Sequence, residues 1–304
     1  MSKKNQNIVI LGAGESGVGA AILAKKNDWN IFVSDFGKIT PAHQKSLNEL
    51  NVDWEENTHS MKKILQADLV VKSPGIPESA NVIVKLIEKG IKIISEIEFA
   101  GYYSKAKTIC ITGSNGKTTT SLLTYHILKN AGVSVGLAGN IGESFAKQVA
   151  NENYDWYVLE LSSFQLDGMF EFRADIAMLL NITPDHLDRY DYDINKYALS
   201  KFRVLQNQTA NDWAIINKDD PIIQKELNKR KLSAKIAPFS MKEELGLGGY
   251  INKEQLIINT NEKFTMSIHD LALKGKHNAQ NSLASGIASR ILESMVLTIH
   301  RKIY

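Results

Sequence analysis

A glycine-rich loop followed by a lysine and a threonine is the part of this sequence best equipped for chemistry. The largely β-branched run 108–112 leads through Gly113 and Gly116 to Lys117 and Thr118. Glycines let backbone N–H groups converge on phosphate oxygens, the lysine can bridge the β- and γ-phosphates, and the threonine hydroxyl can bind Mg²⁺. Ile111 stands where the full phosphate-loop pattern has its first glycine, so this is the shorter GxxGKT form. We therefore predict an ATP or GTP site in preference to a plain strand-to-helix turn.

Two further polar segments follow apolar runs later in the chain. Glu160 ends the run that starts at Trp156, and residues 181–189, which include His186, follow the run 176–180. If these runs are parallel strands beside the strand of the phosphate loop, all three loops lie at one sheet edge. Glu160 and His186 would then join Thr118 around Mg²⁺ and the triphosphate, where metal ions neutralise charge during phosphoryl transfer. A histidine considered alone more often has a structural hydrogen-bonding role, but these neighbours favour the metal site.

A second glycine loop lies near the N-terminus. Gly12, Gly14 and Gly17 form a GxGxxG pattern after a predicted strand, and Asp35 ends the next strand, where a ribose-binding acid belongs. The pattern fits NAD, and it fits the pyrophosphate of a uridine nucleotide equally well. A solvated carboxylate is the simpler interpretation of Asp35 alone. The stiff turn 73–75 at the same edge favours a nucleotide crevice.

Alternating strands and helices position these loops. Strands are predicted at 7–11, 30–33, 68–71 and 91–94, then from 108 and at 133–137, 156–161, 176–180 and 213–216, with a strand-rich stretch over 235–258. Helices are predicted at 18–26, 80–89 and 277–292. The fold class is therefore α/β, with parallel strands joined by right-handed crossovers. We expect a Rossmann-like N-terminal domain over 1–95, a P-loop ATPase-like central domain with a mostly parallel sheet over 96–292, and a short tail over 293–304.

Composition narrows the classes of partner. The chain has 304 residues, which suggests two domains, and 43% of them are apolar, as in soluble globular proteins. A net charge of +3 and the absence of a dense Lys/Arg stripe argue against nucleic acid. No long apolar segment predicts a signal or membrane helix. Cys110 is the single cysteine, which excludes a disulfide within the chain and predicts a buried apolar role in a reducing cytoplasm.

The combined motifs resemble the Mur ligase family. The resemblance covers about residues 7–290, and its parts are specific in combination, whereas either glycine loop alone occurs in many nucleotide-binding proteins. The matching segments are Ser73–Pro77, Gly113–Thr118, Gly139–Gly142, Glu160–Gln165, Asn181–Arg189 and Gly275–Asn281.

The resemblance implies an ATP-dependent amide ligation. The γ-phosphate would pass to the alanyl carboxylate of UDP-N-acetylmuramoyl-L-alanine, and the amine of D-glutamate would attack the resulting acyl phosphate. Its cofactors would be ATP and Mg²⁺, and its setting would be peptidoglycan precursor synthesis in the cytoplasm. We further expect a monomer without nucleic-acid or membrane partners.

The resemblance also assigns roles to residues. Lys117, His186 and Lys201 would be catalytic, and Thr118, Glu160, His186 and Lys201 would hold magnesium. ATP would be bound by Gly113, Ser114, Asn115, Gly116, Lys117, Thr118, Thr119, Asn278 and Asn281. The UDP-linked substrate would be bound by Gly14, Glu15, Ser16, Asp35, Gly75 and Asn140.

Lys201 requires a chemical change to serve as a metal ligand. An ammonium has hydrogen-bond donors only, whereas reaction of the neutral amine with CO₂ gives a carbamate with carboxylate-like oxygens. Judged from the sequence alone, a lysine on a polar helix would be solvated. The match of 197–201 to the family's carbamylated-lysine segment is what implies carbamylation.

The end of the chain bears on activity. Family members continue into a C-terminal ligase domain, which the resemblance does not find here, so we expect weak or absent ligation by this chain. Two alternatives stay open: another ATP-dependent amide ligase, similar to folylpolyglutamate synthetase, and a non-catalytic nucleotide-binding module.

Overall fold

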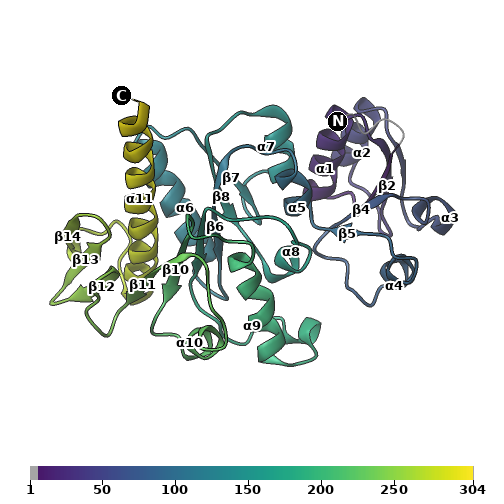
Figure 1. Cartoon of the computed structure of the whole chain (residues 1–304). Helices are drawn as coiled ribbons and strands as arrows, with labels where there is room; N and C mark the ends of the chain where they lie inside the picture. Colours follow the sequence, from purple (N-terminus) through teal and green to yellow (C-terminus); the bar gives the residue numbers. More distant parts are fainter. Residues whose placement is uncertain (1–5, 304) are drawn as a thin grey trace. The chain divides into compact units, whose positions relative to one another are not determined.

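The computed structural model describes residues 6–303, with side chains up to residue 295, and divides the chain into two compact units (Figure 1). Unit 1 comprises the chain up to Lys105 together with Ala138–Asn153 and Phe164–Phe172. Unit 2 comprises Ala106–Leu137, Tyr154–Ser163 and the chain from Arg173 onward. Each unit has its own sheet, so each is described by itself.

Unit 1 is built on a five-stranded parallel sheet with the order β3-β2-β1-β4-β5. The strands are β1 (Asn7–Leu11), β2 (Asn30–Ser34), β3 (Asp53–Glu55), β4 (Leu69–Lys72) and β5 (Ile93–Ile94). The helices are α1 (Glu15–Lys26), α2 (Pro41–Glu49), α3 (Met61–Ile64), α4 (Asn81–Glu88), α5 (Glu96–Gly101), α7 (Phe145–Asn151) and most of α8 (Ser163–Asp167). Val9 and Val70 on the central strands pack with Ile83 and Leu86 of α4 in one apolar core.

The structure confirms the Rossmann-like class of this unit, and its first helix starts earlier than predicted. Helix α1 begins at Glu15 and not at residue 18, because Gly14 is its N-cap and an acidic first residue suits a helix N-terminus. Glu15 and Ser16 are therefore helical, outside the loop itself. Strand β3 and helix α2 were not predicted from the sequence.

Unit 2 contains a nine-stranded sheet with the order β14-β13-β12-β11-β10-β9-β6-β8-β7. The strands are β6 (Lys107–Thr112), β7 (Val135–Gly139), β8 (Trp156–Glu160), β9 (Ile176–Leu179), β10 (Trp213–Asn217), β11 (Lys235–Ser240), β12 (Gly248–Asn252), β13 (Gln255–Asn259) and β14 (Lys263–Ser267). β12 to β14 form an antiparallel meander, and the strands from β12 back through β11, β10, β9 and β6 to β8 pair in parallel.

The helices of unit 2 cover this sheet. They are α6 (Lys117–Asn130), α9 (Ile194–Phe202), α10 (Pro221–Leu227) and α11 (Lys276–Ile303), with 3-10 turns η1 (Leu187–Tyr190), η2 (Arg203–Leu205) and η3 (Ile268–Asp270). α11 packs beside α6 and against the strands of the meander (Figure 1). Leu283 and Ile287 of α11 share one large apolar core with Ile109 and Ile111 of β6.

The mostly parallel sheet of the central region is confirmed, and three details differ from the sequence prediction. The helix predicted over 277–292 extends to Ile303, through most of the segment interpreted as a tail, and the side chains of 296–303 lie outside the described residues. Strand β14 was not predicted. Cys110 is fully buried, as expected. Among residues 6–303, no helix is both long and apolar enough to cross a membrane.

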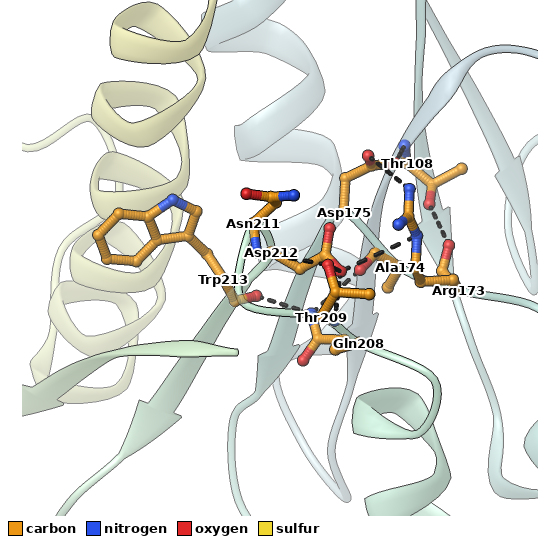
Figure 2. A network of polar contacts seen from close by, with 9 residues as sticks. All are labelled: Thr108, Arg173, Ala174, Asp175, Gln208, Thr209, Asn211, Asp212 and Trp213. Carbon is orange, nitrogen blue, oxygen red and sulfur yellow. Dashed lines mark hydrogen bonds and ion pairs between the residues drawn. The ribbon is translucent and has the colours of Figure 1, made fainter. Parts of the chain in front are cut away.

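A polar network ties together the strand beginnings of unit 2 (Figure 2). The backbone N–H of Thr108 donates to Asp175 over 2.9 Å, and Arg173 lies 3.8 Å from Asp175 and 3.9 Å from the buried Asp212. Gln208 donates to two backbone carbonyls over 3.0 Å each. The network fixes the amino ends of β6, β9 and β10, the edge opposite the phosphate loop.

Candidate functional site

The phosphate loop joins the carboxyl end of β6 to the first turn of α6. Gly116 is the N-cap of α6 with a φ of +81°, a left-handed conformation that glycine adopts without strain. It offers no side-chain cap, so the first N–H groups of a 14-residue helix have no side-chain partner at that position. Thr118 is exposed and Thr119 half-buried in this first turn. The arrangement is an anion cradle at a helix N-terminus.

Lys117 lies over this cradle. Its ammonium donates to the carbonyls of Gly113 over 2.9 Å and of Ser114 over 2.8 Å. Burial lowers the pKa of Lys117, although the charges of Glu160 and Asp185 act in the opposite direction. The lysine is thus held in place at the loop with carboxylates nearby.

The loop is also held from the neighbouring strand by Asn181, which follows β9. The Asn181 side chain accepts from the N–H of Asn115 over 2.8 Å and donates to the carbonyl of Asn115 over 2.9 Å. Ser114 donates to the carbonyl of Thr183 over 2.8 Å. Sequence reasoning noted Asn181 only as part of a polar run, and its role depends on the β6–β9 pairing.

Glu160 and His186 differ in their exposure. Glu160 ends β8 opposite Ile111 of β6 and is 1% exposed. His186 has a φ of +49° at the start of η1, its side chain is 58% exposed, and its ring lies 3.7 Å from Asp185. The charges of Glu160 and Asp185 both act on Lys117. Glu160 is thus placed beside the loop, and His186 adjoins it through Asp185.

Lys201 is buried, contrary to the solvated position that a polar helix suggested. Its side chain is 1% exposed on α9, and its ammonium lies 4.7 Å from the centre of the Tyr197 ring. The Tyr197 hydroxyl lies 3.2 Å from that of Ser114, and burial raises the pKa of Tyr197 to about 12. Tyr197, which the sequence did not single out as a site residue, therefore links Lys201 to the phosphate loop.

The first turns of α11 complete this side of unit 2. Asn281 approaches the loop so closely that a Cβ added to Gly116 would lie 2.6 Å from its side-chain oxygen. Asn278 lies one turn earlier and donates to the carbonyl of Lys274 over 2.8 Å. The predicted ATP residues of unit 2 thus come from the loop after β6, from α6 and from α11, and Asn281 of α11 lies against Gly116 of the loop.

Unit 1 contains a separate cavity of about 760 Å³ at the carboxyl ends of its strands. Gly14, Asp35 and Gly75 line it, together with Phe36 and His59. A Cβ on Gly17 would lie 1.9 Å from the carbonyl oxygen of Gly12, so the third glycine of the loop is required for close packing.

Asp35 holds the first glycine loop in place. One carboxylate oxygen accepts from the N–H of Ala13 over 2.7 Å, and the other accepts from Gly37 over 2.8 Å. Asp35 is therefore not simply a solvated strand-end carboxylate. Phe36, 74% exposed, packs on the ring of His59 at 5.6 Å, and burial lowers the pKa of His59. Sequence reasoning missed both aromatic residues because neither belongs to a recognisable motif.

The other predicted substrate residues of unit 1 lie outside the cavity lining. Glu15 and Ser16 are in the first turn of α1, and Asn140 is exposed in the loop between β7 and α7. A Glu15 oxygen accepts from the N–H of Ser144 over 3.5 Å. The loop that carries Asn140 is therefore adjacent to the start of α1 within this unit.

Among the described residues, no group of three or more His, Cys, Asp or Glu side chains is arranged to hold a metal. The predicted magnesium set contains only two residues of these types, Glu160 and His186. Its other ligands would be the hydroxyl of Thr118 and a modified Lys201.

Comparison with known protein families gives two matches along the chain. Residues 6–95 match the N-terminal domain of MurD-like Mur ligases, and residues 111–289 match the Mur ligase middle domain. The two matches fall on the two regions that carry the glycine loops described above.

Curated relatives match nearly the whole chain. A UDP-N-acetylmuramoylalanine–D-glutamate ligase of Christiangramia forsetii is 51% identical over 98% of this chain and 67% of the relative. The ligase of the same name from Bacteroides fragilis is 55% identical over 94% of this chain and 64% of the relative. The chain thus spans about two thirds of the length of these relatives.

Solved structures share the fold. The Neisseria UDP-N-acetylmuramate:L-alanyl-gamma-D-glutamyl-meso-diaminopimelate ligase has a TM-score of 0.64 at 21% identity, covering 94% of this chain and 93% of that one. The UDP-N-acetylmuramate-alanine ligase of Thermotoga maritima has a TM-score of 0.56 at 17% identity, covering 95% of this chain and 66% of that one.

Proposed function

The chain belongs to the Mur ligase family, and we propose that it provides the nucleotide and UDP-substrate sites of a ligase that adds D-glutamate to UDP-N-acetylmuramoyl-L-alanine. The observation that carries this proposal is the match at 51–55% identity, over nearly all of the chain, to relatives named for that reaction. The proposed setting is peptidoglycan precursor synthesis by a cytoplasmic monomer.

ATP is the proposed ligand of the phosphate loop. The uncapped start of α6 supplies N–H groups, and Lys117 supplies a cation that can leave its two carbonyl partners for phosphate oxygens. Asn278 and Asn281 would contact the adenine from α11. Glycine at 116 leaves room for Asn281 beside the loop.

In the ligation, the chain's own groups would stabilise charge and exclude water. As the γ-phosphoryl group moves to the alanyl carboxylate, Lys117 would offset the developing negative charge, and Asn181 would keep the loop in one conformation. Both reactants, a carboxylate and D-glutamate, are anionic, so the positive groups also reduce their mutual repulsion.

Magnesium is the proposed metal beside the loop. Thr118 and Glu160 offer the oxygen ligands that Mg²⁺ prefers, and the imidazole of His186 would adjoin them. Bound Mg²⁺ would neutralise phosphate charge and orient the phosphoryl oxygens.

Lys201 is the proposed fourth member of this set, as a carbamate. Its side chain is buried on α9 with the Nζ atom over the ring of Tyr197, which contacts Ser114 of the phosphate loop. Native mass spectrometry should show an added CO₂ on the parent and not on Lys201→Ala. Short carboxylic acids should restore part of the nucleotide turnover of that variant. An unmodified parent whose turnover exceeds that of Lys201→Ala would contradict the carbamate.

The cavity of unit 1 is the proposed site of the uridine nucleotide. Gly14, Asp35 and Gly75 line it, and Glu15, Ser16 and Asn140 would extend the contacts toward the muramoyl-alanyl part. Calorimetric titration should show binding of UDP-N-acetylmuramoyl-L-alanine and none of NAD. Binding of NAD alone would refute the assignment of this cavity.

The decisive experiment measures incorporation of labelled D-glutamate by this chain, together with acceptor-dependent phosphate release. We expect ATP and the UDP-linked substrate to bind, and phosphate release that depends on D-glutamate would support the ligase reaction. Lys117→Ala should abolish ATP binding, whereas Lys129→Ala, at the other end of the same helix, should not. Phosphate release stimulated by a folate acceptor would favour the alternative ligase class.

A further inference from the structure

A second cavity lies in unit 2, away from the residues proposed to bind ATP. It measures about 370 Å³, a size that accommodates a small molecule. Its walls come from α6, β13, β14, the segment 270–273 and α11. The mechanism proposed above uses none of its lining residues.

The walls are largely apolar. Leu123 and Ile127 lie one turn apart on α6, and Leu256 and Ile258 of β13 face the same space. Phe264 and Leu273, 40% and 39% exposed, stand at its margin, where contact with water is unfavourable. Water finds few hydrogen-bond partners in such a space, so an apolar occupant is favoured.

Small residues on α11 leave the space open. Ser282, Gly286 and Ser289 are spaced at four and three residues, on one face of the helix, and all three line the cavity. At Gly286 the helix approaches β13 so closely that a Cβ would lie 2.5 Å from Ile258. Helix and strand are in contact there, and the cavity lies between them and α6.

Charged side chains in and beside the lining favour an uncharged occupant. Arg290 lines the cavity, and its guanidinium is already paired with Glu293 and lies 4.0 Å from Glu262. With Asp270 also in the lining, an anionic ligand would meet an excess of negative charge.

We propose that this cavity binds a small uncharged apolar molecule, and that its occupancy acts on the phosphate loop. The path is short. Beside the cavity, the hydroxyls of Thr124 and Ser285 are 3.1 Å apart, and Ser285 donates to the carbonyl of Thr120 over 3.2 Å. One turn further toward the helix starts, α6 and α11 meet at Gly116 and Asn281. A molecule pressed against both helices therefore changes their spacing at the loop.

The binding test uses Prodan, a neutral naphthalene with a ketone, whose fluorescence reports an apolar environment. The parent should bind one equivalent saturably. Ser289→Phe and, from another wall, Ala272→Phe should each weaken binding by about tenfold or more, because the added ring fills the space. Leu122→Phe, on α6 but outside the lining, is the matched control and should bind like the parent. Unchanged binding by the filled variants, with parent-like circular dichroism, would overturn the site.

The coupling to the loop has its own measurement. Amide resonances of Gly116, Lys117 and Asn281 should shift with the same Kd as those of Leu123. Shifts confined to the cavity lining would refute the coupling to the loop.

Discussion

Replacing Glu96 with glutamine should remove most of the pH dependence of unit 1's stability between pH 5 and 8. Glu96 is 3% exposed at the start of α5, and one of its oxygens accepts from the Ser144 hydroxyl over 2.6 Å and from the Ala146 N–H over 2.5 Å. Burial raises its pKa to about 7, the charge of Glu15 adds to the effect, and the two hydrogen bonds oppose it. A glutamine oxygen can accept both hydrogen bonds without ionising.

The sign of the pH effect on stability follows from how many protons the folded and unfolded states bind. In the unfolded chain the carboxyl ionises near its ordinary value of 4.5, whereas the folded carboxyl keeps its proton up to about 7. The folded state therefore binds more protons between these values, and stability falls as pH rises through this window. A tenfold change in proton affinity corresponds to about 1.4 kcal/mol, so ionising Glu96 costs about 3 kcal/mol at pH 8.

The variant should gain up to about 3 kcal/mol over the parent at pH 8 and differ by less than about 1 kcal/mol at pH 5. Hydrogen exchange of peptides from β1 and β4, measured in urea at several pH values, reports the unfolding of unit 1 directly. Parallel pH profiles for parent and variant would show that Glu96 is not the titrating group, and the reasoning would fail.

Glu98, two residues further along α5, provides the matched control. One of its oxygens accepts from the N–H groups of Phe170 and Phe172, and the other from Glu171 N–H and Tyr102 hydroxyl. A glutamine NH₂ would face donors, so Glu98→Gln should lose about 2–3 kcal/mol at every pH. Opposite outcomes at two buried positions of one helix would separate ionisation from hydrogen-bond geometry.

Three other changes follow from the described contacts. Asp212→Asn should lower the stability of unit 2 by about 2 kcal/mol, because Asp212 accepts hydrogen bonds from the N–H and hydroxyl of Thr209 and lies near Arg173. Its ATP affinity, measured by calorimetry, should not change, since this network lies at the sheet edge opposite the phosphate loop. Asn181→Asp should weaken ATP binding about tenfold in the same titration, because it removes the donor to Asn115 and adds a negative charge. Unchanged affinity would contradict the role of Asn181 in holding the loop. Gly17→Ala should cost more than about 3 kcal/mol by thermal unfolding, since its Cβ would overlap a backbone carbonyl.

Local patterns made part of this structure predictable. The GxxGKT loop, the parallel strands beside it and the N-terminal glycine loop are encoded by neighbouring residues whose types allow few other conformations. Strand β3 has only three residues, Asp-Trp-Glu, without an alternating apolar pattern, and it is defined by its register with β2. β14 likewise depends on its pairing with β13. Such edge strands owe their structure to partners that a single sequence does not identify.

The candidate site likewise contains residues that local sequence predicts and residues that it does not. Gly116 and Lys117 are recognisable from spacing, whereas the burial of Lys201 follows from how α9 packs, which its polar neighbours do not reveal. Tyr197 was visible only as part of a family segment. Its contact with Ser114 joins residues 83 positions apart. Side chains that are proposed to bind ligands directly thus leave a local signature, and those that hold the loop in place do not.

Both units stabilise their glycine loop with the same kind of hydrogen bond. In each, a residue within two positions of the end of a neighbouring parallel strand accepts an N–H from the loop. Asp35, after β2, does so for the loop that follows β1, and Asn181, after β9, does so for the loop that follows β6. The chemical difference has a physical reason under the proposed function. A carboxylate beside a triphosphate would repel it, whereas an amide accepts the same N–H without charge and also donates to a loop carbonyl. In unit 1, a ribose hydroxyl can donate to the carboxylate, so the charge of Asp35 favours a ligand there.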